Sequence, residues 1–253
     1  MKQKVVVGIP VRMGSSRFPG KPLCDILGKS MVEHVYRRSG LASQVTRVFV
    51  ATCDEEIKQA VQSFGGNVYM TPKEISRPGL GVAEACKQMD LRDEDIVVVV
   101  QGDEPLVNPQ MIDLAIEPLV SDPEVFCVNL AADLSNGDWK DPNEIKVVTD
   151  IKMNAIFMSR SPIPSHTRDR KGHRMKQVCI MPFTKKNLFD FQAMPETPLE
   201  IAESIEMLRA IEHGLKVRMV KTDFVSKSVD NDQDRKTVEK LMADDAVYKK
   251  HGF

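Results

Sequence analysis

Five consecutive β-branched residues, Ile96 to Val100 (IVVVV), limit the folds open to this chain more than any other stretch. A short run without polar positions is typical of a strand that is buried on both faces, as in the centre of a parallel sheet. Similar strand-like runs begin at Val5, Val45 and Asn67, and segments with helical spacing of apolar residues separate them. Because strands that alternate with helices build parallel sheets, we expect an α/β fold with a mostly parallel central sheet flanked by helices.

The second half of the chain follows this alternation less regularly. Gln177 to Phe183 reads as one strand, and Pro198 to Gly214 as one amphipathic helix. A closing strand is expected over Val225 to Val229, before a last helix from Asp232. At 253 residues the chain can form one large domain, so we expect a single unit over 1–253, with a smaller α+β region inserted at about 155–200.

Composition excludes several classes of partner. The chain has 35 basic and 36 acidic residues, so no field of one sign points to nucleic acid or to an anionic membrane. Its five cysteines are scattered and form no C-x-x-C pair, which favours a reduced, cytoplasmic protein. The N-terminus lacks the apolar core of a secretion signal, and no apolar run approaches the roughly 18 residues that span a bilayer.

The segment after the first strand, IPVRMGSSRFPGKPL, concentrates anion-binding chemistry. Glycines let backbone N–H groups approach phosphate oxygens, hydroxyls donate further hydrogen bonds, and guanidinium groups match phosphate geometry. The cations are Arg12, Arg17 and Lys21, the hydroxyls are Ser15 and Ser16, and the glycines are Gly14 and Gly20. The segment matches neither the Walker nor the Rossmann phosphate pattern. We interpret it as a polyphosphate-binding loop, and the alternative is a solvated loop with chance cations.

Two aspartates stand at positions where a metal could bind. Asp103 follows the IVVVV run directly, and ligands of open α/β sheets bind outside the carboxyl ends of strands. Its short, hard carboxylate suits Mg²⁺, although a turn built by Gly102 and Pro105 would explain the same residues. Asp230 precedes the last expected helix, and from local sequence alone a helix cap is the better interpretation there.

A set of segments in fixed order gives the chain a family resemblance. These segments are RMGSSRFPGKPL, VFVATCDEEI, QGDEP, PNEIKVV, MSRSPIP, PLE followed by Glu203 and Glu206, and SVDNDQD. The chain resembles the CMP-Kdo synthetases, which are 3-deoxy-manno-octulosonate cytidylyltransferases, over nearly its whole length. The resemblance implies a Rossmann-like nucleotide-diphospho-sugar transferase fold, CTP and an acidic sugar as substrates, Mg²⁺ as cofactor, and a homodimer that forms through the inserted acceptor and dimerisation region.

The same resemblance assigns roles to individual residues. Catalytic roles fall to Arg12, Arg17, Lys21 and Asp103, and metal binding to Asp103 and Asp230. The nucleotide-binding set is Pro10, Arg12, Gly14, Ser15, Ser16, Lys21, Arg77 and Gln101. The acceptor-binding set is Arg160, Gln177, Met181, Glu203, Glu206 and Met207.

Several positions depart from the family pattern. The usual Ser-Gly-Thr-acid-Arg segment is replaced around Arg77, and its arginine falls on Gly81. Gln177 and Met181 stand where a histidine and a tyrosine usually face the sugar, and Met207 replaces a glutamine. Because the phosphate loop and both aspartates are kept, we expect the reaction to be retained and the acceptor to differ.

The sequence therefore predicts an enzyme that transfers CMP from CTP to a Kdo-like acidic sugar, with release of pyrophosphate, for cell-surface polysaccharide or lipopolysaccharide synthesis. One alternative is a nucleotidyltransferase of the spore-coat polysaccharide type, whose first loop also reads R-M-G-S-S-R-x-P-G-K. A second alternative is a catalytically idle nucleotide-binding sensor. The retention of both aspartates together with Lys21 favours an enzyme.

Overall fold

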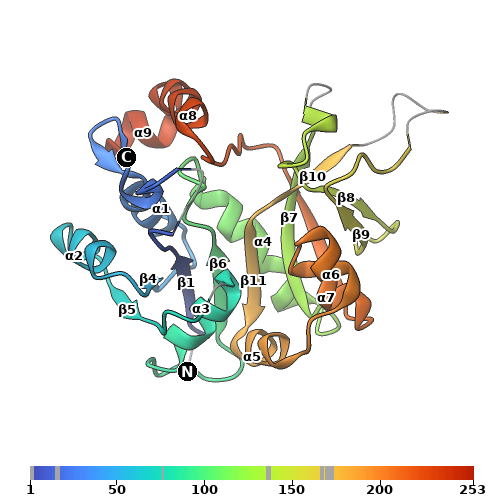
Figure 1. The fold of residues 1–253 in the computed structure, drawn as a ribbon. Coiled ribbons are helices and arrows are strands. Elements are labelled where there is room, and N and C mark those ends of the chain that lie inside the picture. The colour runs from blue at the N-terminus through green and yellow to red at the C-terminus, as the bar shows by residue number, and fades with distance from the viewer. Residues whose placement is uncertain (1–2, 15–17, 76, 135–137, 166–167, 169–173) are drawn as a thin grey trace.

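The computed structural model describes residues 3–253 except 15–17, 76, 135–137, 166–167 and 169–173. Its main feature is a ten-stranded sheet in the order β5-β4-β1-β6-β11-β7-β10-β8-β9, with β12 paired to β7 (Figure 1). The strands are β1 (Val5–Pro10), β4 (Arg47–Thr52), β5 (Val68–Met70), β6 (Ile96–Val100), β7 (Cys127–Asp133), β8 (Lys146–Thr149), β9 (Ala155–Ser159), β10 (Met175–Val178), β11 (Ile180–Thr184) and β12 (Val217–Thr222).

Most of these strands run in one direction. The ladder pairings place β1, β4, β5, β6, β7, β8 and β12 in one direction and β9, β10 and β11 in the other. The IVVVV run forms β6, lies between β1 and β11, and is fully buried. The predicted α/β fold with a mostly parallel central sheet is confirmed. A separate two-stranded sheet joins β2 (Asp25–Ile26) to β3 (Lys29–Ser30).

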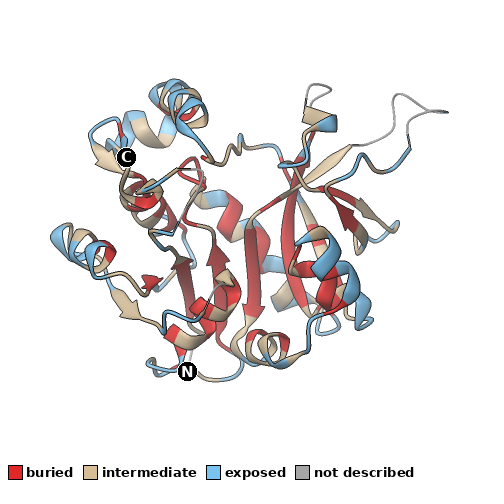
Figure 2. Ribbon diagram, viewed as in Figure 1, coloured by how far each residue is buried: buried red, intermediate tan, exposed pale blue. Residues whose placement is uncertain are grey.

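Helices cover both faces of the sheet (Figure 2). Apolar side chains fill the layers between the helices and the sheet. One core layer packs α1 (Met31–Ser39), α2 (Glu55–Ser63) and α4 (Pro109–Ser121) against the sheet. The other packs α3 (Pro78–Cys86), α5 (Lys185–Ala193) and α7 (Met207–Glu212) against the opposite face. The remaining helices are α6 (Pro198–Glu203), α8 (Asp232–Asp244), α9 (Ala246–His251) and the short 3-10 turns η1 (Lys21–Leu23) and η2 (Asp138–Lys140). Within the described residues, no helix is long and apolar enough to cross a membrane.

Two local predictions were wrong, and a third was right apart from one interruption. The predicted helix from Pro198 breaks at Ser204, whose φ of 54° is left-handed, so α6 and α7 are separate. The predicted strand over Val225 to Val229 belongs instead to an irregular connection from β12 to α8. The predicted strand from Gln177 to Phe183 is present but interrupted at Cys179, and its two parts, β10 and β11, both pair with β7 on the side opposite β12.

Candidate active site

The carboxyl ends of the parallel strands β1 and β6 bring two loops into contact. Gly8 of β1 lies beside Val99 of β6, so the residues that follow each strand emerge at the same edge. Gly102 is needed at this point, because a Cβ there would lie 2.0 Å from the Val11 side chain. The loop that carries Arg12 and the loop that carries Asp103 are thereby held against each other.

Lys21 lies between two carboxylates at this edge. Its Nζ is 2.7 Å from Asp103 Oδ2 and 3.3 Å from Asp230 Oδ1. The Val229 backbone N–H donates to the Asp103 carbonyl at 3.0 Å, which brings the connection between β12 and α8 to this edge. Burial acts to lower the pKa of Lys21, but Asp103 and then Asp230 outweigh that effect and raise it. Lys21 is therefore a cation at neutral pH.

A cavity of about 210 Å³ opens beside this cluster. The described members of the predicted nucleotide-binding set all line it. They are Pro10, Arg12, Gly14, Lys21, Arg77 and Gln101. Gly81, where the family arginine falls, also lines it, and among the described residues a Cβ there would meet only the Ile75 side chain, at 3.9 Å. The predicted contributions of Ser15, Ser16 and Arg17 lie outside the described residues.

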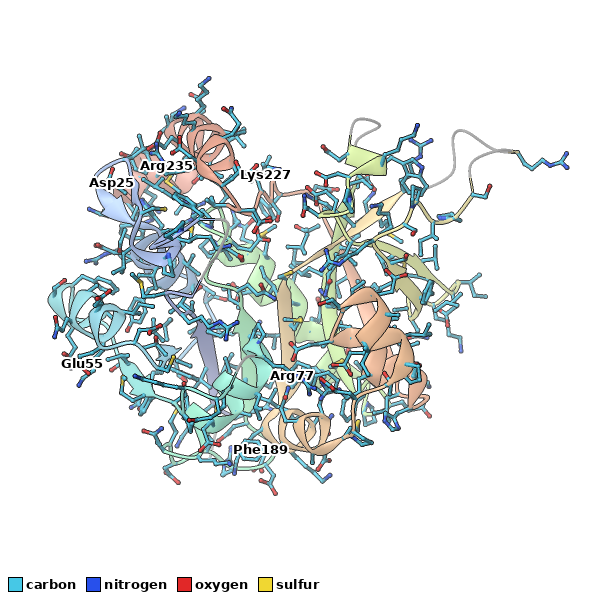
Figure 3. All side chains as sticks on the ribbon, in the orientation of Figure 1. Asp25, Glu55, Arg77, Phe189, Lys227 and Arg235 are labelled. Atoms are coloured by element: carbon cyan, nitrogen blue, oxygen red, sulfur yellow. The ribbon has the colours of Figure 1, made fainter. Side chains whose placement is uncertain are left out.

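A larger cavity of about 640 Å³ adjoins the first. The two share Arg77, Pro78, Gln101 and Asp103 in their walls. Of the predicted acceptor-binding set, Arg160, Gln177, Met181, Glu206 and Met207 line the larger cavity. Glu203 is absent from the described lining of both cavities. Arg77, labelled in Figure 3, forms an ion pair with Glu196 at the boundary.

Glu203 supports Arg160. Its carboxylate accepts hydrogen bonds from Ser159 Oγ at 2.7 Å and from the Arg160 backbone N–H at 2.9 Å. The Arg160 guanidinium donates to three main-chain carbonyls, those of Glu203 (2.8 Å), Pro142 (3.0 Å) and Ser204 (3.3 Å). Carbonyl groups fix the guanidinium without neutralising its charge, so the Arg160 side chain remains a positively charged group in the cavity wall.

The positions that depart from the family pattern are anchored in the core. Gln177 donates its amide to Asn129 Oδ1, and Asn129 in turn donates to the carbonyls of Val178 (2.7 Å) and Leu130 (3.0 Å). Met181 and Met207 are only 4% and 2% exposed. The wall formed by these residues therefore offers less hydrogen bonding than a histidine, a tyrosine and a glutamine would.

Comparison with known proteins identifies the family. A family model described as Cytidylyltransferase matches residues 6–221. The chain belongs to the cytidylyltransferase family. It is 42% identical over 251 residues to the 3-deoxy-manno-octulosonate cytidylyltransferase of Geobacter metallireducens, covering 94% of this chain and 98% of that relative. It is 39% identical to the 8-amino-3,8-dideoxy-manno-octulosonate cytidylyltransferase of Shewanella sp. strain ANA-3, covering 95% and 99%.

A solved structure agrees with this assignment. The structure of CMP:2-keto-3-deoxy-manno-octonic acid synthetase complexed with CTP superposes with a TM-score of 0.88 and 35% identity, covering 95% of this chain and 99% of that one. The predicted resemblance to the CMP-Kdo synthetases is confirmed. A cytidylyltransferase from Leptospira borgpetersenii, at 16% identity and a TM-score of 0.65, shares the fold. The chain is therefore an enzyme of the nucleotidyltransferase type.

Within this cytidylyltransferase, Glu206 is an unusual carboxylate. Burial raises its pKa, and the nearby Arg209 and a hydrogen bond from the Gly79 backbone offset only part of that effect. Its Oε1 atom is buried without a hydrogen-bond partner among the described residues. Gly79 makes room for this arrangement, because a Cβ there would lie 2.6 Å from Gln192 Nε2. A ligand that donates a hydrogen bond would satisfy Glu206.

Sequence reasoning missed several further residues of the larger cavity, among them Glu104, Glu144, Lys176 and Ser226. Burial, followed by the neighbouring Asp103, raises the pKa of Glu104 to about 7. Glu104 accepts a hydrogen bond from Ser226 Oγ at 2.9 Å, and Lys176 lies 3.0 Å from Glu144. A sequence signal existed for Glu104, since an acid placed between a strand and the apolar run Pro105 to Val107 has little access to solvent.

The site of this cytidylyltransferase is compatible with Mg²⁺. Asp103 and Asp230 supply hard carboxylate oxygens within reach of one cationic group, the Lys21 ammonium. Among the described residues, no three metal-ligating side chains gather in one place. Mg²⁺ is commonly held by one or two carboxylates together with water and substrate phosphates, so two aspartates beside a phosphate-binding loop fit this ion.

Proposed function

We propose that this enzyme is a Mg²⁺-dependent cytidylyltransferase that transfers CMP from CTP to a Kdo-like sugar acid and releases pyrophosphate. The observation that carries the proposal is the junction of the two cavities at Asp103, beside Lys21 and Asp230. A nucleotide in the smaller cavity and an acceptor in the larger one would place their reacting groups at this junction. We assign the product to cell-surface polysaccharide or lipopolysaccharide synthesis.

The residues at the junction are suited to displacement at the α-phosphorus of CTP. Such a reaction requires that two anions approach each other while charge develops on the phosphoryl oxygens and on the leaving pyrophosphate. Lys21 and Arg12 supply positive charge beside the smaller cavity, and Arg17 is proposed to do the same. Asp103 and Asp230 would hold Mg²⁺, which supplies charge neutralisation on the phosphates and a lowered pKa at the attacking hydroxyl.

The larger cavity has features that suit an acidic sugar. The Arg160 guanidinium, whose contacts are main-chain carbonyls, offers a positive group for a carboxylate. Glu206, which lines the same cavity, would accept hydrogen bonds from sugar hydroxyls. Met181 and Met207 would contact apolar faces of the sugar, where the family pattern has polar groups.

A second candidate acceptor is a sugar acid that carries an amino group. The Shewanella relatives are named for an 8-amino sugar acid. Among the described residues that line the larger cavity, acidic side chains outnumber cationic ones, and Glu206 lacks a partner for Oε1. An ammonium group beside a buried carboxylate would form a charge-assisted hydrogen bond.

Pyrophosphate release tests the proposal. The purified enzyme is incubated with Mg²⁺, each of CTP, UTP, GTP and TTP, and a panel of 2-keto-3-deoxy sugar acids with and without an amino group. We expect turnover with CTP and at least one of these acids, and its loss in Asp103→Asn. Turnover with another nucleotide would favour the spore-coat type. Nucleotide binding without turnover on any acceptor would favour the sensor. The absence of pyrophosphate release with every nucleotide and acceptor would refute the proposal.

We also propose a homodimer that forms through the region of about 155–200. Strand β9 is an edge of the sheet, and Ile156 on it is 58% exposed. Unpaired edge strands with exposed apolar side chains favour association with another chain. Light scattering during size-exclusion chromatography would measure the mass, and Ile156→Lys should lower it to that of one chain. A monomeric wild type would contradict this proposal.

A further inference from the structure

Asp230 is carried by a segment that has no regular secondary structure of its own. Residues 223–231 connect β12, in one half of the molecule, to α8, which lies beside α1 in the other half (Figure 1). Lys227, labelled in Figure 3, belongs to this connection. Fixing the backbone of each residue costs about 1–2 kcal/mol, so a connection of this kind keeps one conformation only where other contacts hold it.

Two contacts fasten the connection to the loop that carries Asp103. The Val229 N–H donates to the Asp103 carbonyl at 3.0 Å, and Val229 itself is fully buried against α1 and α8. Three residues earlier, Ser226 Oγ donates to Glu104 Oε2 at 2.9 Å. Both contacts reach the same turn after β6, so they set where Asp230 lies relative to Asp103.

A third contact comes from β10, in the wall of the larger cavity. Lys176, on β10, donates to the Ser226 carbonyl at 3.3 Å and to Glu144 Oε2 at 3.0 Å. The side chains of Lys176 and Glu144 are only 12% and 13% exposed, so this ion pair is well shielded from solvent. Lys227 of the same connection also faces Glu144, at 3.9 Å.

We propose that Lys176 is a positioning residue for the metal site: by bridging Glu144 and the Ser226 carbonyl, it holds the connection that carries Asp230. This inference rests on the proposed function, because it concerns the two carboxylates that would bind Mg²⁺. Groups that orient metal ligands without touching the metal typically contribute about 10–100-fold to metal affinity or activity. Lys176 touches neither carboxylate, so its effect should appear through Asp230.

The test measures metal binding without turnover. Mn²⁺ replaces Mg²⁺ as a probe, and proton relaxation enhancement reports formation of the enzyme·CTP·Mn²⁺ complex in the absence of acceptor. In Lys176→Met we expect the affinity for Mn²⁺·CTP to fall about 10–100-fold. The affinity for CTP measured in EDTA should stay within twofold of wild type. Lys176→Arg, which can still donate to both partners, should recover most of the Mn²⁺·CTP affinity.

Control variants separate positioning from other roles. Lys221→Met removes a lysine paired with Asp133 on the exposed end of β12 and should bind Mn²⁺·CTP like the wild type. If Lys176→Met does not fold, Ser226→Ala, which removes the contact with Glu104, is expected to weaken Mn²⁺·CTP binding in the same direction.

Three results would overturn the inference. Unchanged Mn²⁺·CTP binding in Lys176→Met and in Ser226→Ala would show that the connection needs neither contact. An equal fall of CTP affinity in EDTA would indicate a general structural role. A rise in the acceptor KM as the only change would indicate a direct substrate contact. Failure of the wild type to bind Mn²⁺·CTP would instead refute the proposed function and, with it, this inference.

Discussion

Replacing Arg209 with methionine should destabilise the wall of the larger cavity by a predictable amount. Arg209 is fully buried and Glu200 is 6% exposed. The Arg209 guanidinium donates through Nε to Glu200 Oε2 at 2.8 Å and through Nη2 to the other carboxylate oxygen. It also donates to the Phe191 carbonyl at 3.1 Å and lies over the Phe191 ring, 4.7 Å from its centroid.

The expected loss in the free energy of unfolding follows from leaving the Glu200 carboxylate buried without its partner. Removing one member of a buried ion pair costs about 3–5 kcal/mol, because the remaining charge stays desolvated. In a chain of this length 1 kcal/mol corresponds to roughly 2–4 °C in the melting temperature, so Arg209→Met should melt about 6–20 °C below wild type. The double variant Arg209→Met with Glu200→Leu removes both charges and should recover most of that loss.

The pH dependence gives a second, independent signature. Burial acts to raise the pKa of Glu200, but hydrogen bonding and charge from Arg209 outweigh it and hold the pKa below its ordinary value. The pair therefore stabilises the folded state above the ordinary glutamate pKa of about 4.3, and this contribution is lost as the pH falls through the lowered value. In Arg209→Met the carboxyl would have a raised pKa, so the destabilisation should shrink between pH 8 and pH 5.

Urea unfolding monitored by circular dichroism at pH 8, 6.5 and 5 measures these free energies of unfolding. Lys216→Met, which removes an exposed lysine paired with Glu124, is the matched control and should stay within about 0.5 kcal/mol of wild type. The reasoning would be refuted if Arg209→Met were as stable as that control. It would also be refuted if the double variant were no more stable than the single one.

Three further outcomes are expected. Lys21→Met should lower kcat roughly 10²–10³-fold, because it removes a preorganised charged donor beside the reacting phosphates. The circular dichroism spectrum should be unchanged, and a kcat within threefold of wild type would contradict the prediction. Gly79→Ala should displace the end of Gln192 and raise the acceptor KM severalfold while the KM for CTP stays constant, which steady-state kinetics would check. Burial lowers the pKa of His34, so the free energy of unfolding should fall as the pH drops below about 6.5 toward that lower value. His34→Gln should remove this pH dependence in urea unfolding measured between about pH 7.5 and 5.5. A variant whose free energy of unfolding changes with pH as in the wild type would argue against it.

Local sequence was sufficient for the elements that place the phosphate loop. The runs that became β1 and β6 carry their own signal, and parallel pairing sends the residues after them to one edge. Because β1 and β6 pair in parallel, the loops that follow them bring Lys21 into contact with Asp103. Asp230 was harder to interpret, because its neighbourhood reads as a helix cap, and it comes to Lys21 only through an irregular connection.

The acceptor side could not be read in the same way. The helix breaks at Ser204, where no glycine or proline predicts a break. Because of this break, Glu203 contacts Ser159 and Arg160, whereas Glu206 lines the cavity. Such a division of roles between two nearby acids depends on contacts with strands far away in the sequence. Lys176 and Glu144 were missed for the same reason, since pairing of β10 with β7 and β8 brings them to the larger cavity.

Strand β10 shows how an altered acceptor is compatible with a retained reaction. Lys176 reaches the connection that carries Asp230, whereas the next residue, Gln177, is tied to Asn129 within the sheet. Under the proposed function, a change at Gln177 alters the acceptor wall without disturbing the contact that holds the metal ligand. Selection on the acceptor can therefore act on Gln177 while Lys176 continues to hold the phosphoryl-transfer geometry.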